Sequence, residues 1–248
     1  MTQSNARRKF IRNFSIALSA IPLSACGGDD DPSYEGITYA HGVASGDPLA
    51  DRVILWTRIS APAGADDLDV GWTVAEDHGF AKVVASGTAR TGAARDFTVK
   101  VDATGLSANR RYYYRFRCQG IDSPVGRTKT LPTGSVTQAR FAVFSCSNYP
   151  AGYFNVYGDA AKFDDIDVGL HLGDYIYEYA AGGYASQDAA AMGRVSQPAT
   201  EIITLTDYRR RYQQYRTDPD LQAVHARMPF ITVWDDHELT NDTWRDGA

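Results

Sequence analysis

Three unbroken apolar runs, residues 141–145, 167–172 and 230–234, each end in a cluster of polar side chains. Unbroken apolar strands are typical of a sheet that is covered on both faces. Candidate helices at 154–163 and 205–224 lie between the runs, so residues 139–248 are predicted to form an α/β domain with crossover connections. The polar clusters then follow the carboxyl ends of the strands, where open α/β sheets keep their sites.

These clusters contain the residue types that bind metals. The first contains Cys146, the second contains Asp174 and Tyr177, and the third contains Asp236 and His237. Clusters that meet at one sheet edge bring carboxylates together, and neighbouring carboxylates repel each other unless a cation lies between them. The three clusters together therefore predict a metal centre.

Each residue also has a structural interpretation. Cys146 fits a small buried side chain, and Asp174, which follows a glycine, fits a turn residue or a helix N-cap. Asp236 and the aspartate before it fit caps of a following segment. Tyr177 fits a packing aromatic, and His171, between apolar neighbours, fits a core or supporting position better than a metal ligand.

Residues 36–133 show a different pattern of short apolar runs separated by turn residues. Strands are predicted near residues 38–43, 52–58, 69–75, 81–86, 97–101, 112–118 and 125–130. Short strands without a helical period predict an immunoglobulin-like or fibronectin-like β-sandwich. In the sixth strand Tyr112 and Cys118 fall on one apolar face. Leu106, six residues before Tyr112, resembles the tyrosine corner of fibronectin-type domains, in which the phenol anchors the preceding turn.

Residues 1–26 predict an export signal. Arg7 and Arg8 precede a short apolar run and match the twin-arginine pattern, although Ala6 replaces the usual Ser or Thr. Cys26 ends a segment that resembles a bacterial lipobox, which predicts a lipid anchor at Cys26; the alternative is a plain signal with an incidental cysteine. Residues 27–35 are rich in Gly and Asp and predict a flexible linker. We therefore expect export by the twin-arginine machinery to the periplasm or cell envelope.

Charge and cysteine usage narrow the classes of partner. The net charge is −5 and there is no long basic run, which argues against nucleic acid as the main partner. Exported proteins are free to oxidise, so a disulfide between Cys118 and Cys146 is an alternative to a metal-binding Cys146.

In these motifs the chain resembles the PhoD-type alkaline phosphatases, a branch of the metallophosphoesterases. The resemblance runs along most of residues 38 to 245. It rests on Gly42-Val43-Ala44-Ser45-Gly46-Asp47-Pro48, Val53-Ile54-Leu55-Trp56-Thr57-Arg58, Phe144-Ser145-Cys146-Ser147, His171-Leu172-Gly173-Asp174-Tyr175-Ile176-Tyr177 and Trp234-Asp235-Asp236-His237-Glu238. Ordinary metallophosphoesterases open with Asp-x-His, and the replacement by Ser-Cys-Ser here matches the PhoD-type variation.

The resemblance implies a β-sandwich followed by a two-layered α/β/β/α phosphoesterase domain, with a site that contains Fe³⁺ and Ca²⁺. It implies that Cys146, Asp174 and Tyr177 bind ferric iron and that Asp174 bridges to the second metal. Asp236 falls where related enzymes place a metal-binding Asn, and His237 falls on the catalytic histidine.

The implied function is metal-dependent hydrolysis of phosphate monoesters or diesters outside the cytoplasm. Because the chain ends at Ala248, soon after the third cluster, we expect an incomplete metallophosphoesterase domain whose remaining ligands lie further on; Asn241 is one more candidate within the chain. Two alternatives stay open: a phospholipase-D-like enzyme, and a non-catalytic surface lipoprotein with an inactive, truncated phosphoesterase half.

Overall fold

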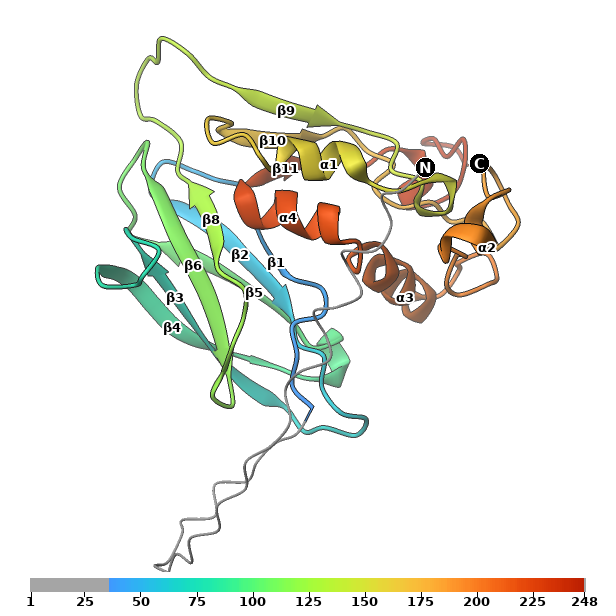
Figure 1. The fold of residues 1–248 in the computed structure, drawn as a ribbon, viewed down its shortest axis with the longest axis horizontal. Coiled ribbons are helices and arrows are strands. Elements are labelled where there is room, and N and C mark those ends of the chain that lie inside the picture. The colour runs from blue at the N-terminus through green and yellow to red at the C-terminus, as the bar shows by residue number, and fades with distance from the viewer. Residues whose placement is uncertain (1–35, 248) are drawn as a thin grey trace, which may run out of the picture. The chain divides into compact units, whose positions relative to one another are not determined.

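The computed structural model of the protein describes residues 36–247 (Figure 1). The predicted export signal at 1–26, the lipid anchor at Cys26 and the linker at 27–35 lie outside the described residues. Within the described part, every helix is too short or too polar to cross a bilayer.

Residues 36–247 contain a six-stranded mixed sheet that takes strands from both predicted halves of the chain. Its order is β5-β2-β1-β11-β10-β9, with β9, β10 and β11 parallel to one another. The two halves join where β1 pairs with β11, at Gly46 and Phe230. The strands are β1 (Val43–Gly46), β2 (Arg52–Arg58), β5 (Thr98–Thr104), β9 (Phe141–Phe144), β10 (Val168–His171) and β11 (Phe230–Thr232).

A second sheet, antiparallel, is built only from the first half. Its strands within the described residues are β3 (Leu68–Ala75), β4 (Val83–Thr91), β6 (Arg111–Cys118), β7 (Ile121–Asp122) and β8 (Gly126–Lys129). It shares a hydrophobic core with the β5-β2-β1 part of the first sheet, where Leu55 packs in the same buried cluster as Val70 and Phe116. The first half is therefore sheet-rich, as predicted.

Strand predictions in this half are confirmed where alternation is strong. The predicted strand 52–58 coincides with β2, and β6 buries the alternating residues from Tyr112 to Cys118. The Tyr112 hydroxyl accepts a hydrogen bond from the Ser107 backbone N–H at 2.8 Å, which confirms the predicted anchoring of the preceding turn. The strand predicted at 38–43 is wrong for most of its length: Thr38 makes only an isolated bridge to Ser60, because the chain turns before β1 begins at Val43.

Helices α1 (Asn155–Ala160) and α4 (Pro219–Arg227) lie against β9, β10 and β11 (Figure 1). Phe144 and Phe230 from the sheet, Tyr157 from α1 and Leu221 from α4 share one core. The opposite face carries a row of exposed apolar side chains, namely Phe141, Val143, Leu172, Ile231 and Val233. The prediction of a sheet covered on both faces is therefore wrong for the described residues, because both helices lie on one face.

The predicted helix 205–224 is two helices, α3 (Leu205–Tyr215) and α4. Pro219 lacks a backbone N–H and stands at the start of α4, which favours a new helix over continuation. Asp218 caps α4 by accepting from the N–H groups of Asp220 and Leu221 at 3.0 and 3.1 Å. The remaining short helices are α2 (Ala189–Met192), η1 (Ala93–Arg95), η2 (Tyr149–Ala151) and η3 (Asp236–Glu238).

Candidate metal centre

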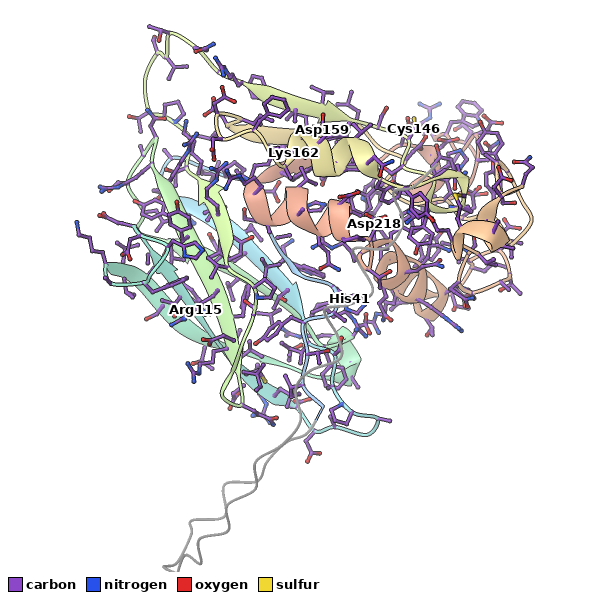
Figure 2. All side chains as sticks on the ribbon, viewed as in Figure 1. His41, Arg115, Cys146, Asp159, Lys162 and Asp218 are labelled. Carbon is purple, nitrogen blue, oxygen red and sulfur yellow. The ribbon has the colours of Figure 1, made fainter. Side chains whose placement is uncertain are left out.

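The loops that follow β9, β10 and β11 meet at one edge of the sheet. The Cys146 N–H donates to the Gly173 carbonyl at 3.2 Å, which ties the first loop to the second. Gly173 has φ +107°, and a Cβ there would lie 2.4 Å from the Cβ of Asp235, so only glycine lets the third loop approach this closely. Figure 2 shows Cys146 just beyond β9, at this edge.

Three predicted residues place ligand atoms together. One side-chain donor atom from each of Asp174, Asp236 and His237 lies within 4.8 Å of the other two. Asp174 is 7% exposed, and its Oδ2 accepts a hydrogen bond from the Tyr177 hydroxyl at 3.2 Å. Its Oδ1 is buried without a hydrogen-bond partner among the described residues. A buried carboxylate oxygen left unpaired costs free energy that a cation would offset, so this donor set fits a metal ion.

Tyr177 and Cys146 lie beside this group. The Tyr177 ring is buried, with its centroid 4.2 Å from that of His237. Burial, with Asp174 and then Cys146 nearby, raises the pKa of Tyr177 well above its ordinary value. Cys146 is exposed, with φ +58°. The packing interpretation of Cys146 is therefore wrong, because the left-handed turn at Cys146 leaves its side chain open to solvent rather than in the core.

His237 is held by a residue that sequence reasoning missed. Its Nδ1 lies 2.8 Å from Oε2 of Glu178, which is 1% exposed, and the other Glu178 oxygen accepts the Asn241 N–H at 2.8 Å. A carboxylate accepts hydrogen bonds, so Nδ1 carries the proton and Nε2 is left for a metal or a substrate. In the sequence, the only sign of this supporting role is an acidic residue directly after Tyr177, at the end of the second cluster.

Glu238 is a second missed residue, and it clamps the loops of the centre. Its Oε2 accepts from the N–H groups of Asp174 at 3.0 Å and Asp235 at 2.8 Å, while Oε1 accepts from the Tyr175 N–H. One buried carboxylate thus joins the loop after β10 to the loop after β11. It fixes the backbone on either side of the candidate ligands.

The capping interpretation holds for Asp235 and not for Asp236. Asp235 accepts from the Asp236 N–H at 3.1 Å and forms a capping box with Glu238 at the start of η3. Asp236 instead joins Asp174 and His237. A hydrogen bond from the Asp242 backbone, and the nearby His237, hold the pKa of Asp236 below its usual range.

His171 occupies a supporting position. It is buried, and its Nε2 lies 3.1 Å from Ser147 Oγ and 3.0 Å from the Tyr157 hydroxyl. Burial lowers the pKa of His171 to about 4, so the ring is neutral at ordinary pH. The Asn241 side chain is already bonded, accepting from the Tyr179 hydroxyl at 3.0 Å and donating to Asp242 at 2.8 Å.

The disulfide alternative is wrong. Cys118 and Cys146 are both free thiols. Cys118 is fully buried in the core between the two sheets, whereas Cys146 is exposed at the edge of the sheet formed by β9, β10 and β11.

Comparison with known families covers both halves of the chain. The family described as PhoD-like phosphatase matches residues 141–248, and the family described as PhoD-like phosphatase, N-terminal domain, matches residues 26–132. The chain belongs to the PhoD-like phosphatases. The resemblance drawn from the motifs is confirmed.

Two PhoD-like proteins are similar to this chain over most of its length. Alkaline phosphatase D of Bacillus subtilis (strain 168) is 41% identical over 251 residues, which cover 95% of this chain and 42% of that protein. A solved structure of PhoD is 43% identical with a TM-score of 0.79, and the match covers 85% of this chain and 41% of that chain. The chain thus spans less than half the length of these relatives.

Proposed function

We propose that this protein hydrolyses phosphate esters, monoesters or diesters, in a metal-dependent reaction outside the cytoplasm. The observation that carries the proposal is the convergence of Asp174, Asp236 and His237 around a buried, unpartnered carboxylate oxygen at one edge of an α/β sheet. Membership of the PhoD-like phosphatases and the name of the Bacillus subtilis relative support the same chemistry.

The donors fit two metals of different character. Cys146, Asp174 and Tyr177 would hold Fe³⁺, because thiolate and phenolate are anionic ligands that suit a trivalent ion. Asp174 and Asp236 would hold Ca²⁺, which prefers carboxylate oxygens. Such ions, when bound, supply an activated water and neutralise charge on the phosphoryl oxygens.

Residues of this chain protonate the leaving group. Water adds to phosphorus as the bond to the ester oxygen breaks, and that oxygen needs a proton to leave as an alcohol. His237 donates this proton from Nε2, and Glu178 at Nδ1 stabilises the protonated ring before transfer. The Tyr177 ring, packed on His237, keeps the imidazole in place.

The proposal also covers the domain organisation of the chain and the cellular location of the protein. Residues 36–133 would form the immunoglobulin-like or fibronectin-like sandwich and residues 139–248 an incomplete metallophosphoesterase domain. The paired Arg7 and Arg8 support export by the twin-arginine route, with Cys26 as a lipid anchor. Replacing both arginines by Lys should leave precursor in the cytoplasm, and unchanged export would count against this route.

Absorption spectroscopy tests the metal assignment. Charge transfer from thiolate or phenolate to ferric iron should give the purified, active protein a visible band. Cys146→Ser and Tyr177→Phe should each shift or bleach that band and lower activity. Cys118→Ser removes a thiol remote from the centre and is the matched control. A colourless active enzyme, or a band insensitive to both substitutions at the centre, would contradict the assignment.

A further inference from the structure

A long segment, residues 178–204, whose only regular element is the short helix α2, connects the second cluster to α3 and is fixed in place beside the metal centre. The buried Arg211 guanidinium donates to the backbone carbonyls of Tyr179 at 3.0 Å and Gln197 at 2.9 Å, and also to that of Tyr177. Inside the segment, the Ala181 N–H donates to the Ala199 carbonyl at 2.9 Å. The segment therefore presents its side chains from a backbone that is already ordered.

This segment places two further tyrosines next to the reacting groups. The Tyr179 ring centroid lies 5.3 Å from that of His237, and the Tyr184 ring lies 6.1 Å from Tyr179 and 6.5 Å from Tyr177. The Tyr184 carbonyl accepts from the Asn148 side chain at 3.1 Å, which ties Tyr184 to the loop that carries Cys146. Tyr179 and Tyr184 together are called the aromatic rim below.

The aromatic rim is more exposed to solvent than tyrosines that serve only packing. Tyr184 is 65% exposed although its backbone is bonded to the core of the site. A tyrosine that served only packing would bury its ring, because each aromatic side chain removes a large apolar area from water. Here an ordered ring stays exposed beside Tyr177 and Tyr179, the two rings that pack on His237. The organic group of an ester must lie close to His237 when its oxygen takes a proton from that residue.

We propose that the aromatic rim is a subsite that stacks on the organic group of the substrate, so that the protein prefers phosphate esters whose alcohol carries a planar ring. This rests on the proposed phosphoesterase function. The subsite needs little reorganisation on binding, because Arg211 and Asn148 hold the segment beforehand. Aromatic pairs contribute beyond the area they bury, and ring stacking on tyrosine does not require a particular hydrogen-bond pattern.

Matched esters test the preference. Benzyl phosphate and ethyl phosphate release alkoxides of similar basicity and differ in the ring, and their methyl diesters extend the comparison if diesters are preferred. The wild type should show a higher kcat/KM for the benzyl ester. Tyr184→Ala should lower the benzyl-to-ethyl ratio about three- to ten-fold, whereas Tyr184→Phe keeps a ring and should preserve it. Phe163→Ala is the matched control, since Phe163 is 54% exposed and lies outside the rim.

Binding without turnover separates this proposal from the proposed function. Calorimetry with benzylphosphonate and ethylphosphonate on the metal-loaded protein should show the same ratio and the same loss in Tyr184→Ala. If neither ester is hydrolysed but the binding ratio responds, the phosphoesterase function falls and the subsite stands. A wild type that binds both phosphonates equally or not at all, or a Tyr184→Ala variant that keeps the ratio, would overturn the subsite.

Discussion

Replacing Glu238 by Gln should destabilise the protein strongly without changing side-chain volume. The Glu238 carboxylate accepts from the N–H groups of Asp174 and Asp235 through Oε2, and from Tyr175 and Ile176 through Oε1. A glutamine puts an NH₂ group in place of one oxygen. Whichever oxygen is lost, two backbone N–H donors, one buried and one partly buried, lose their acceptor and face another donor.

The magnitude follows from those two donors. A buried donor left unsatisfied costs about 1–3 kcal/mol, so the substitution should lower the free energy of unfolding by roughly 4 kcal/mol. With a urea dependence of about 2–3 kcal/mol per molar, the midpoint of unfolding should fall by roughly 1.5 M. Because whole domains are stable by only about 5–15 kcal/mol, the variant should fold but with little reserve.

Urea unfolding of the wild type, Glu238→Gln and Glu201→Gln measures this. Glu201 is exposed, so its substitution removes the same charge without removing a buried acceptor and should change stability by less than about 0.5 kcal/mol. A loss below about 1 kcal/mol for Glu238→Gln would refute the clamp. Equal losses in both variants would show that the charge matters and the hydrogen bonds do not.

Three further outcomes are expected. Tyr112→Phe should lower the free energy of unfolding by about 1–3 kcal/mol in urea titrations, because the Ser107 N–H loses its acceptor, and a change near zero would argue against the corner. Glu178→Gln should lower kcat roughly 10²-fold in steady-state assays, because His237 loses the carboxylate that orients its ring through Nδ1; a change in KM with kcat unchanged would contradict this. Burial and two neighbouring arginines lower the pKa of His41 to about 4. At His41 the unfolded chain therefore takes up a proton below about pH 6.5 that the folded state does not bind, and this residue alone should lower stability by about 2 kcal/mol between pH 7.5 and 5. Urea titrations of His41→Gln should show a shallower pH dependence, and an unchanged slope would contradict the assignment.

Local patterns were enough to predict the elements whose side chains alternate or whose strands end in clusters. The strand β2 and the buried face of β6 follow from a period of two, which any half-buried strand must show. Asp174, Asp236 and His237 could be grouped because parallel neighbouring strands deliver their carboxyl ends to one edge.

The joining of the two halves could not be predicted in the same way. The six-stranded sheet is continuous only because Gly46 pairs with Phe230, and this single register position leaves no periodic signal in either segment. Local sequence pattern also could not predict which face of the sheet the helices cover. Phe141 and Val143 are as apolar as the buried Phe144 beside them, yet they are exposed, because which face a helix covers is decided by the crossover and not by strand composition.

The third cluster shows why a correctly recognised motif did not reveal the role of each of its residues. Asp235, Asp236, His237 and Glu238 are consecutive, and the sequence left a capping role open for both Asp235 and Asp236. The chain forms the 3₁₀ helix η3 here, with about three residues per turn, so Asp235 and Glu238 come to the same side and cap each other. The two residues between them are turned away toward Asp174. The helix type therefore divides the cluster into a pair that holds the backbone and a pair that faces the metal centre. This division depends on the backbone geometry of η3, which cannot be deduced from the four residue types alone.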